Sequence, residues 1–228
     1  MKILVTGARG KLGSEVVKCF SSKGLNVVSY SHSMNLAELD WNNIDIIVNC
    51  AAVIPSENVT QEEYLDGNVF FLQKLLKYSK GKVFIHFSTF SELYKDDFYQ
   101  KSKMIANSLL LINLGVFKDL KILPLPTLED DQLINKIVGL ASAGSTPKVD
   151  RLKYNYMSFK DVAKFLKNIV VNRSNIFISD FYVKKDLYDE VVKRVDAGLV
   201  VEGRLVDRVL LDSGVYQVMP EMIESLSK

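Results

Sequence analysis

The stretch KILVTGARGKLG, residues 2–13, joins a strand pattern to a glycine-rich turn and the start of a helix. Its first residues form a short β-branched run, and glycines follow at positions 7, 10 and 13. Apolar side chains then recur at helical spacing from Leu12 until Gly24. Such a turn lets the backbone approach a pyrophosphate, while the helix offers the anion its free N–H groups. We expect a dinucleotide-binding turn, with a purely structural turn as the alternative.

Strand and helix patterns alternate beyond this stretch. Further apolar runs typical of strands lie at residues 25–30, 44–51, 82–88 and 120–126. Helical patterns cover residues 56–81, which could be two helices broken near Gly67, and residues 96–115. The passage 31–43 is short for a crossover helix. Buried strands that alternate with helices are typical of a parallel sheet covered on both faces.

The sequence therefore predicts an α/β fold with a Rossmann-like, doubly wound parallel sheet. We assign residues 1–125 to this dinucleotide-binding domain. The pattern loosens after Pro126, and residues 126–228 are expected to form a small substrate-binding lobe with elements that return to the sheet. Open sheets of this kind bind ligands beyond the carboxyl ends of their strands, where we expect the site.

The composition excludes several other classes of protein. The 228 residues are 48% hydrophobic and 25% charged, as in an ordinary soluble globular protein. A net charge of +2 with scattered lysines argues against a nucleic-acid partner. No apolar stretch reaches the roughly 20 residues that span a bilayer, and the start lacks a signal peptide's apolar region. We expect a cytoplasmic protein with no membrane partner. Cys19 and Cys50 lack metal-ligand spacing, so no metal site is expected.

The second expected strand bears on the choice of cofactor. An NAD site usually has an acidic residue at the end of this strand, but no Asp or Glu occurs between Glu15 and Glu38. Arg9 in the glycine turn instead supplies a guanidinium that could pair with a 2′-phosphate. We therefore expect NADP in preference to NAD.

Tyrosine and lysine occur four residues apart in three places, which are Tyr78/Lys82, Tyr99/Lys103 and Tyr156/Lys160. Residues four apart on one helix share a face, and a nearby ammonium favours the ionised form of a phenol. The first pair straddles Gly81, where a helix should end, and the third crosses an expected cap at Ser158. Tyr99 and Lys103 alone share one continuous helix, so they are the candidate catalytic pair. A solvated surface pair is the alternative.

Together these residues resemble the extended short-chain dehydrogenase/reductase family, which contains nucleotide-sugar epimerases, dehydratases and reductases. The resemblance rests on motifs in the family's order, which are TGARGKLG (6–13), NCAA (49–52), Asn68, FSTFSELY (87–94) and YQKSK (99–103). The shortened passage LAELDWNNIDIIVNCAAVI (36–54) is most similar to the dTDP-4-dehydrorhamnose reductase branch. The likeness is strong to about residue 125 and looser beyond it.

The resemblance implies roles for individual residues. Tyr99 would be the general acid/base, and Lys103 would lower its pKa and hold the nicotinamide ribose. Thr89 would hydrogen-bond the substrate oxygen, with Ser88 and Ser91 as rivals because STFSELY is one residue longer than the common form. The implied cofactor-binding residues are Gly7, Arg9, Gly10, Lys11, Leu12, Gly13, Ala51, Ala52, Asn68, Tyr99 and Lys103.

The implied activity is the NAD(P)-dependent reduction of a keto group on a nucleotide-activated sugar. A nucleotide-sugar epimerase or dehydratase is the alternative enzyme, and a dinucleotide-binding regulatory protein without turnover is the alternative of another class. The chain reads PLPTLED (124–130) where the family usually has an arginine, and residues 126–156 are short for a lobe that encloses a nucleotide sugar. In the family, helices near residues 68–79 and 99–113 commonly build a dimer interface, so a homodimer is also implied.

Overall fold

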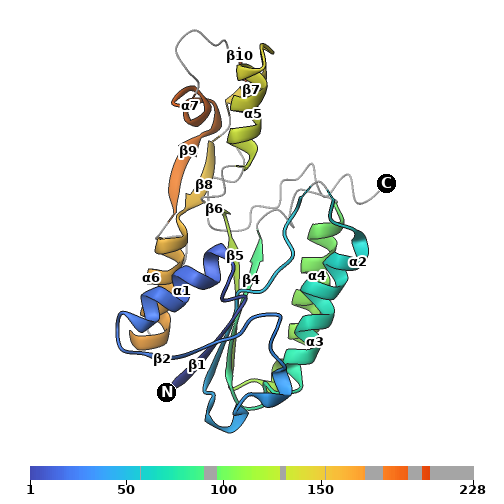
Figure 1. Ribbon diagram of the computed structural model, residues 1–228, viewed down its shortest axis with the longest axis vertical. Coiled ribbons are helices and arrows are strands. Elements are labelled where there is room, and N and C mark those ends of the chain that lie inside the picture. The colour runs from blue at the N-terminus through green and yellow to red at the C-terminus, as the bar shows by residue number, and fades with distance from the viewer. Residues whose placement is uncertain are drawn as a thin grey trace. The chain divides into compact units, whose positions relative to one another are not determined.

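The computed structural model describes residues 1–56, 58–89, 97–128, 132–151, 153–172, 182–194 and 202–205 (Figure 1). The chain divides into two compact units. The first comprises Met1–Pro126 and Ser158–Phe181, and the second comprises Thr127–Met157 and Tyr182–Lys228. In the described part of the chain, no helix is long and apolar enough to cross a membrane.

The first unit is built on a parallel sheet of five strands in the order β2-β1-β3-β4-β5. The strands are β1 (Lys2–Thr6), β2 (Asn26–Ser29), β3 (Ile46–Asn49), β4 (Val83–Thr89) and β5 (Asp119–Leu125). The strand order confirms the predicted Rossmann-like, doubly wound fold. The central strands are continuous apolar runs because both of their faces are covered, and Ile3, Leu4 and Ile47 are fully buried.

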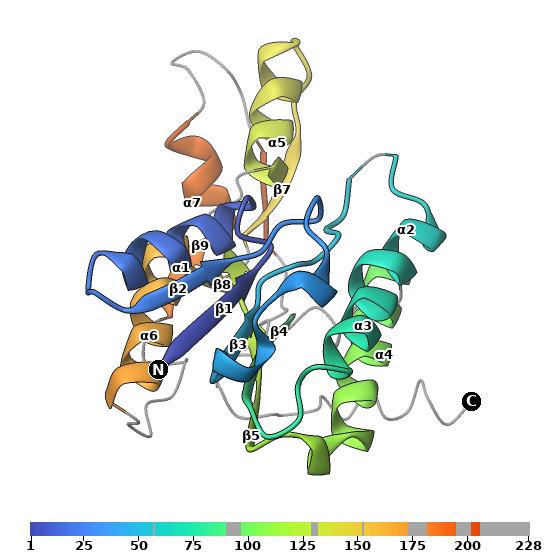
Figure 2. The same cartoon turned by 60° about the horizontal axis from the view of Figure 1, so that its bottom comes forward.

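Helices cover both faces of this sheet. On one face α1 (Lys11–Ser21) lies beside α6 (Phe159–Asn172), and these two helices are in contact. The opposite face carries α2 (Gln61–Leu65), α3 (Phe71–Leu76) and α4 (Phe98–Ile112), as Figures 1 and 2 show. A core cluster on this second face joins Leu4, Ile47 and Phe84 of the sheet to Leu72 and Leu75 of α3, and to Ala106 and Leu110 of α4.

The connection from β2 to β3 contains two short 3-10 helices, Leu36–Glu38 and Trp41–Asn43. This agrees with the short crossover predicted from the sequence. Trp41 anchors the connection, because its Nε1 donates to the carbonyl oxygen of Leu36 at 2.7 Å and its ring stacks on Tyr78 at 4.5 Å.

The helical pattern that begins after Ser56 becomes one uninterrupted helix with an irregular centre. A π-helical segment, Asp66–Phe70, lies between α2 and α3. Thr60 caps the start of α2, since its hydroxyl accepts from the N–H of Glu63 and the Glu63 carboxylate accepts from the N–H of Thr60. A Cβ on Gly67 would lie 2.3 Å from Cγ2 of Val53. The lack of a side chain at Gly67 therefore makes room for Val53, and the helix continues through this position.

The second unit contains two small sheets and two helices. The sheets have the orders β6-β8-β9 and β10-β7. The strands are β6 (Thr127–Leu128), β7 (Lys148–Arg151), β8 (Lys153–Met157), β9 (Val183–Asp186) and β10 (Glu202–Leu205). The helices are α5 (Gln132–Ser142) and α7 (Leu187–Val192). The chain leaves the first unit after Pro126 and returns to it with α6. Substrate binding by the second unit remains a prediction.

Candidate active site

The glycine turn lies between β1 and α1 and packs closely on the end of β3. Gly7 has φ +63°, and a Cβ there would lie 2.7 Å from the backbone nitrogen of Ala51. A Cβ on Gly13 would lie 2.2 Å from the carbonyl oxygen of Gly7, while the N–H of Gly10 donates to that oxygen at 2.9 Å. Side chains at Gly7 and Gly13 would therefore force these backbones apart.

The start of α1 is open to an anion. Gly10 is its N-cap residue and provides no side-chain cap, so the helix leaves its first N–H groups to another acceptor. Arg9 and Lys11 flank this end and are exposed, while Leu12 is half-buried. The residues around this helix end thus suit the pyrophosphate of a dinucleotide.

The end of β2 lies against the same turn. The N–H of Ala8 donates to the carbonyl oxygen of Tyr30 at 3.2 Å, which brings Arg9 next to the residues that follow β2. The hydroxyls of Ser31 and Ser33 lie 3.2 Å apart in this exposed segment. Neutral hydroxyls therefore stand where an NAD site usually has a carboxylate, and Arg9 follows the residue that is bonded to Tyr30.

The segment after β3 is held by Thr6 and Asn68. The N–H of Ala51 donates to Oγ1 of Thr6 at 3.4 Å, and Ala52 next to it is exposed. Asn68, in the π-helical segment, forms two bonds with Val53, since its Oδ1 accepts from the Val53 N–H at 2.8 Å and its Nδ2 donates to the Val53 carbonyl at 3.1 Å. The side chain of Asn68 therefore fixes the backbone that follows Ala51 and Ala52.

Asn68 also reaches the helix that carries the candidate catalytic pair. Its Nδ2 donates to Oγ of Ser102 at 2.9 Å, and the Ser102 hydroxyl donates to the carbonyl oxygen of Tyr99 at 2.6 Å. The ring of Tyr64 from α2 lies 5.8 Å from the ring of Tyr99. Burial, helped by the charges of Asp97 and Glu63, raises the pKa of Tyr64 above its ordinary value. Tyr64 therefore stays neutral beside Tyr99.

Tyr99 and Lys103 lie four residues apart on α4, one turn from each other. Asp97 caps the helix by accepting from the N–H of Gln100 at 3.0 Å. Tyr99 is half-buried, whereas Lys103 is 3% exposed and its ammonium donates to the carbonyl oxygen of Phe87. A buried ammonium one turn from the phenol is an arrangement that can lower the phenol's pKa.

The two rival pairs have other surroundings. Lys82 donates to the carbonyl oxygens of Trp41 and Ile44 at 2.7 and 2.8 Å, so its ammonium is engaged by the backbone. Tyr156 belongs to β8, whereas Lys160 belongs to α6 beyond Ser158, whose hydroxyl accepts from the N–H of Asp161. Neither pair shares one face of a helix.

The structure distinguishes the hydroxyls at the end of β4. Ser88 is 5% exposed, and its Oγ accepts from Nδ2 of Asn107 on α4 at 2.7 Å. Thr89 is half-buried, and because successive side chains of a strand alternate it points to the opposite side of β4. Ser91 lies outside the described residues.

Three supporting residues were not predicted from the sequence, namely Tyr64, Ser102 and Asn107. Asn107 follows Tyr99 and Lys103 at the same four-residue interval, so this spacing could have indicated it. Tyr64 and Ser102 carry no such signal, because their contacts with Tyr99 and Asn68 depend on how α2 and α4 pack.

A cavity of about 670 Å³ lies at the opposite edge of the sheet, between the amino-terminal ends of the strands. Its lining includes Lys82, which is bonded to backbone carbonyls, and Asp45, which accepts from the N–H of Lys2 at 2.7 Å. These groups are satisfied within the protein, so the cavity does not indicate a ligand. No cluster of three or more metal-ligating side chains occurs in the described parts of the chain.

Comparison with known proteins finds one family model that matches the first part of the chain. Residues 3–108 match the NAD dependent epimerase/dehydratase family. No curated protein matches the sequence. Solved structures match over both units, at identities that establish a common fold and no more.

Three of these structures illustrate the likeness. MoeE5 in complex with UDP-glucose and NAD is 20% identical with TM-score 0.66, covering 90% of this chain and 86% of its own. UDP-glucuronic acid 4-epimerase from Bacillus cereus, in complex with NAD, is 15% identical with TM-score 0.68, covering 90% and 87%. A dTDP-4-dehydrorhamnose reductase from Clostridium acetobutylicum is 17% identical with TM-score 0.62, covering 90% and 84%.

Asn68→Ala tests the link between the end of β3 and α4. The substitution removes three hydrogen bonds, to the N–H and carbonyl of Val53 and to Ser102. Since each buried bond is worth about 1 kcal/mol, we expect urea unfolding to show a loss of about 3 kcal/mol. Asn42→Ala, at an exposed position, should change stability by less than about 0.5 kcal/mol. Equal stabilities for the two variants would contradict this role of Asn68.

Proposed function

We propose that this chain, whose residues 3–108 match the NAD dependent epimerase/dehydratase family, is an NAD(P)-dependent enzyme that reduces a keto group on a nucleotide-activated sugar. One observation carries the proposal. Tyr99 and Lys103 share one face of α4, and Lys103 is bonded to the strand β4 whose neighbour β3 ends against the glycine turn. A candidate proton donor and a candidate dinucleotide cradle thus stand at one edge of the same sheet.

The cradle fits a dinucleotide for reasons of space and charge. Side chains at Gly7 or Gly13 would collide with backbone atoms, and the uncapped start of α1 presents N–H groups to an anion. When bound, the reduced nicotinamide supplies the hydride that converts a carbonyl to an alcohol. The protein's part is to place the carbonyl carbon near the nicotinamide and to give the developing oxygen anion a proton.

Tyr99 gives that proton in the proposed mechanism. An ordinary phenol, with a pKa of about 10, is a weak proton donor near neutral pH. The Lys103 ammonium favours the phenolate, and each unit by which it lowers the pKa requires about 1.4 kcal/mol of interaction. Thr89, with Ser88 as its rival, would hydrogen-bond the substrate oxygen, and Ser88 is the one on the side of β4 that faces α4, where its hydroxyl accepts from Asn107.

The structural neighbours are consistent with a nucleotide sugar as substrate. They include a complex with UDP-glucose, a UDP-glucuronic acid 4-epimerase and a dTDP-4-dehydrorhamnose reductase. Both epimerisation and reduction pass through hydride transfer at a sugar carbon, so an epimerase is the second candidate. The short connection between β2 and β3 favours the reductase, in line with the resemblance noted in the sequence.

Tyr99→Phe should remove turnover and leave cofactor binding in place. Loss of a general acid costs about 10²- to 10⁴-fold in rate, whereas the ring that packs on Tyr64 remains. The measurement is NAD(P)H oxidation with a panel of nucleotide 4-keto sugars, beside the dissociation constant for NAD(P)H. Tyr78→Phe, in the rival pair, should behave as wild type. Turnover that survives Tyr99→Phe would refute the mechanism, and tight binding without turnover on any sugar would favour a regulatory protein.

Arg9→Ala tests the preference for NADP. We propose that Arg9 pairs with the 2′-phosphate, since its neighbour Ala8 is bonded to Tyr30 at the end of β2. Hydrogen bonds to a charged group are worth about 1.5–3 kcal/mol, so NADPH affinity should fall by roughly 10- to 100-fold. NADH affinity should change by less than about 2-fold, and Lys18→Ala further along α1 should affect neither. Tighter binding of NADH than of NADPH to the wild type would identify an NAD enzyme.

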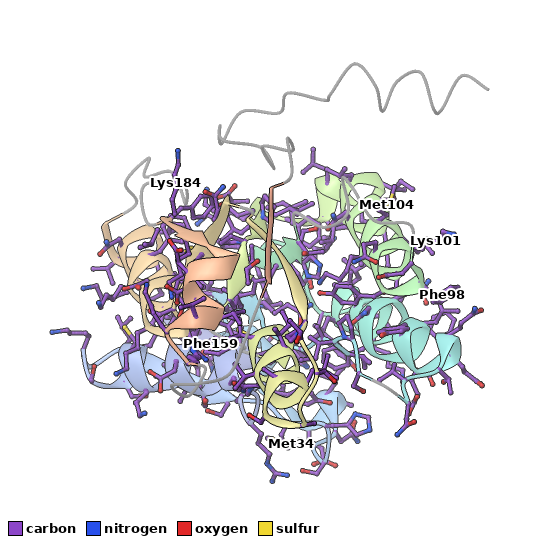
Figure 3. All side chains as sticks on the ribbon, turned by 90° about the horizontal axis from the view of Figure 1, so that it is seen from above. Met34, Phe98, Lys101, Met104, Phe159 and Lys184 are labelled. Carbon is purple, nitrogen blue, oxygen red and sulfur yellow. The ribbon has the colours of Figure 1, made fainter. Side chains whose placement is uncertain are left out.

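We also propose a homodimer through α4 and the preceding helix. Met104, Ile105, Leu111 and Ile112 form an apolar stripe on α4, and Ile112 is 83% exposed. Figure 3 shows Phe98, Lys101 and Met104 along the outer side of this helix. Ile112→Glu should convert a dimer into a monomer of 25.8 kDa in sedimentation velocity at micromolar concentration. Met34→Glu, in a loop, should stay dimeric, and a monomeric wild type would rule the dimer out.

A further inference from the structure

Three buried polar side chains form a row across the sheet. Thr6 of β1 is the register partner of Asn49 on β3, which is the register partner of His86 on β4. Their exposed fractions are 0%, 3% and 2%. Register partners in a parallel sheet point to the same side, which here is the side covered by α3 and α4. The proposed mechanism does not use His86, although it is a titratable group in the middle of the sheet.

The hydrogen bonds of this row fix the hydrogen on the His86 ring. Thr6 Oγ1 accepts from the N–H of Ala51, so its own hydrogen donates to Oδ1 of Asn49 at 2.6 Å. The Asn49 amide nitrogen then donates to Nδ1 of His86 at 3.1 Å. Nδ1 is thus an acceptor, and the neutral ring carries its hydrogen on Nε2. If Asn49 instead donated to Thr6 and accepted from His86, the Thr6 hydroxyl hydrogen would have no acceptor within the row.

The ring lies beside the candidate catalytic lysine. Burial, together with the charge of Lys103, keeps the pKa of His86 well below its ordinary value, so the ring is neutral. Lys103 donates to the carbonyl of Phe87, the residue next to His86. Nε2 of His86 is buried without a hydrogen-bond partner among the described residues. A buried donor without an acceptor destabilises the folded protein, so a functional reason for it is expected.

We propose that His86 is a positioning residue whose Nε2–H tautomer denies the Lys103 ammonium an acceptor inside the core. Because Nδ1 is taken by Asn49 and Nε2 carries hydrogen, the ring offers Lys103 no lone pair. The ammonium donates to the Phe87 carbonyl, from where it would serve Tyr99 and the cofactor. The opposite tautomer would present a lone pair at Nε2 and draw Lys103 inward. The row from Thr6 thereby removes His86 as a competing acceptor for Lys103.

This role of Lys103 rests on the proposed function, whereas the assignment of the hydrogen to Nε2 of His86 rests on the hydrogen bonds of the row alone. The chain has two histidines, His32 and His86, so ¹⁵N-detected histidine spectra of the whole protein contain two ring systems. His32 is exposed and serves as the internal reference. We expect the His86 ring to be in the Nε2–H form throughout the pH range in which the protein is folded. A wild-type ring in the Nδ1–H form overturns the proposal.

Thr6→Val removes the hydroxyl that orders the row and keeps the shape of the side chain. Asn49 can then reverse its amide, so the Nδ1–H form of His86 should become populated in the same spectra. Thr6→Ser, which keeps the hydroxyl, should retain the wild-type spectrum. Spectra that are unchanged in Thr6→Val would refute the ordering of the row.

A double variant separates capture of Lys103 from the direct loss of the Thr6 bond to Ala51. Thr6→Val should weaken NADPH binding by about 10-fold, because Lys103 is drawn toward His86. Thr6→Val/His86→Leu should recover most of this loss, since leucine offers no acceptor, and His86→Leu alone should stay within about 3-fold of wild type. A double variant as weak as Thr6→Val overturns the capture mechanism. If the wild type binds neither NADPH nor NADH, the proposed function fails, and the histidine spectra still decide the tautomer.

Discussion

The close approach of Gly7 to Ala51 is the contact on which the rest of the site depends. Backbone atoms of Cys50 and Ala51, just after β3, occupy the space that a side chain on Gly7 would need. The turn after β1 and the end of β3 are therefore in direct contact. This contact holds three parts at the same edge of the sheet, namely the turn, Thr6 and the residues after Asn49. The start of α1, which offers its N–H groups to an anion, is placed by this contact.

Two polar connections extend this arrangement to α4. Asn68 joins Val53 to Ser102, and Ser102 is bonded to the backbone of Tyr99. The row from Thr6 through Asn49 to His86 reaches β4 at the residue before the carbonyl that receives Lys103. The half of the site that suits a dinucleotide and the half that carries the tyrosine are thus joined by buried hydrogen bonds. Such bonds are costly to break in a medium of low polarity, so they hold the two halves in one geometry.

The π-helical segment, Asp66–Phe70, carries the side chain that joins β3's end to α4. Gly67 touches Val53, and the wider turn around it aims Asn68 at Val53 and Ser102 together. Single π turns inside helices often occur at functional sites, because the inserted residue redirects a side chain at the expense of regular bonding. Here the redirected side chain is the one that connects β3's end to α4.

The sequence by itself determined the fold class, the glycine turn, the short second crossover and the choice of Tyr99 and Lys103 among three similar pairs. These features are local, since strand and helix periodicity, glycine spacing and helix continuity involve neighbours in the chain. Tertiary structure alone decided that Ser88 faces Asn107, that Asn68 bonds to Ser102, and that Thr6, Asn49 and His86 form one row. Partners in those contacts are 19 to 43 residues apart, and strand register and helix packing bring them together. Local sequence patterns carry no record of such distances.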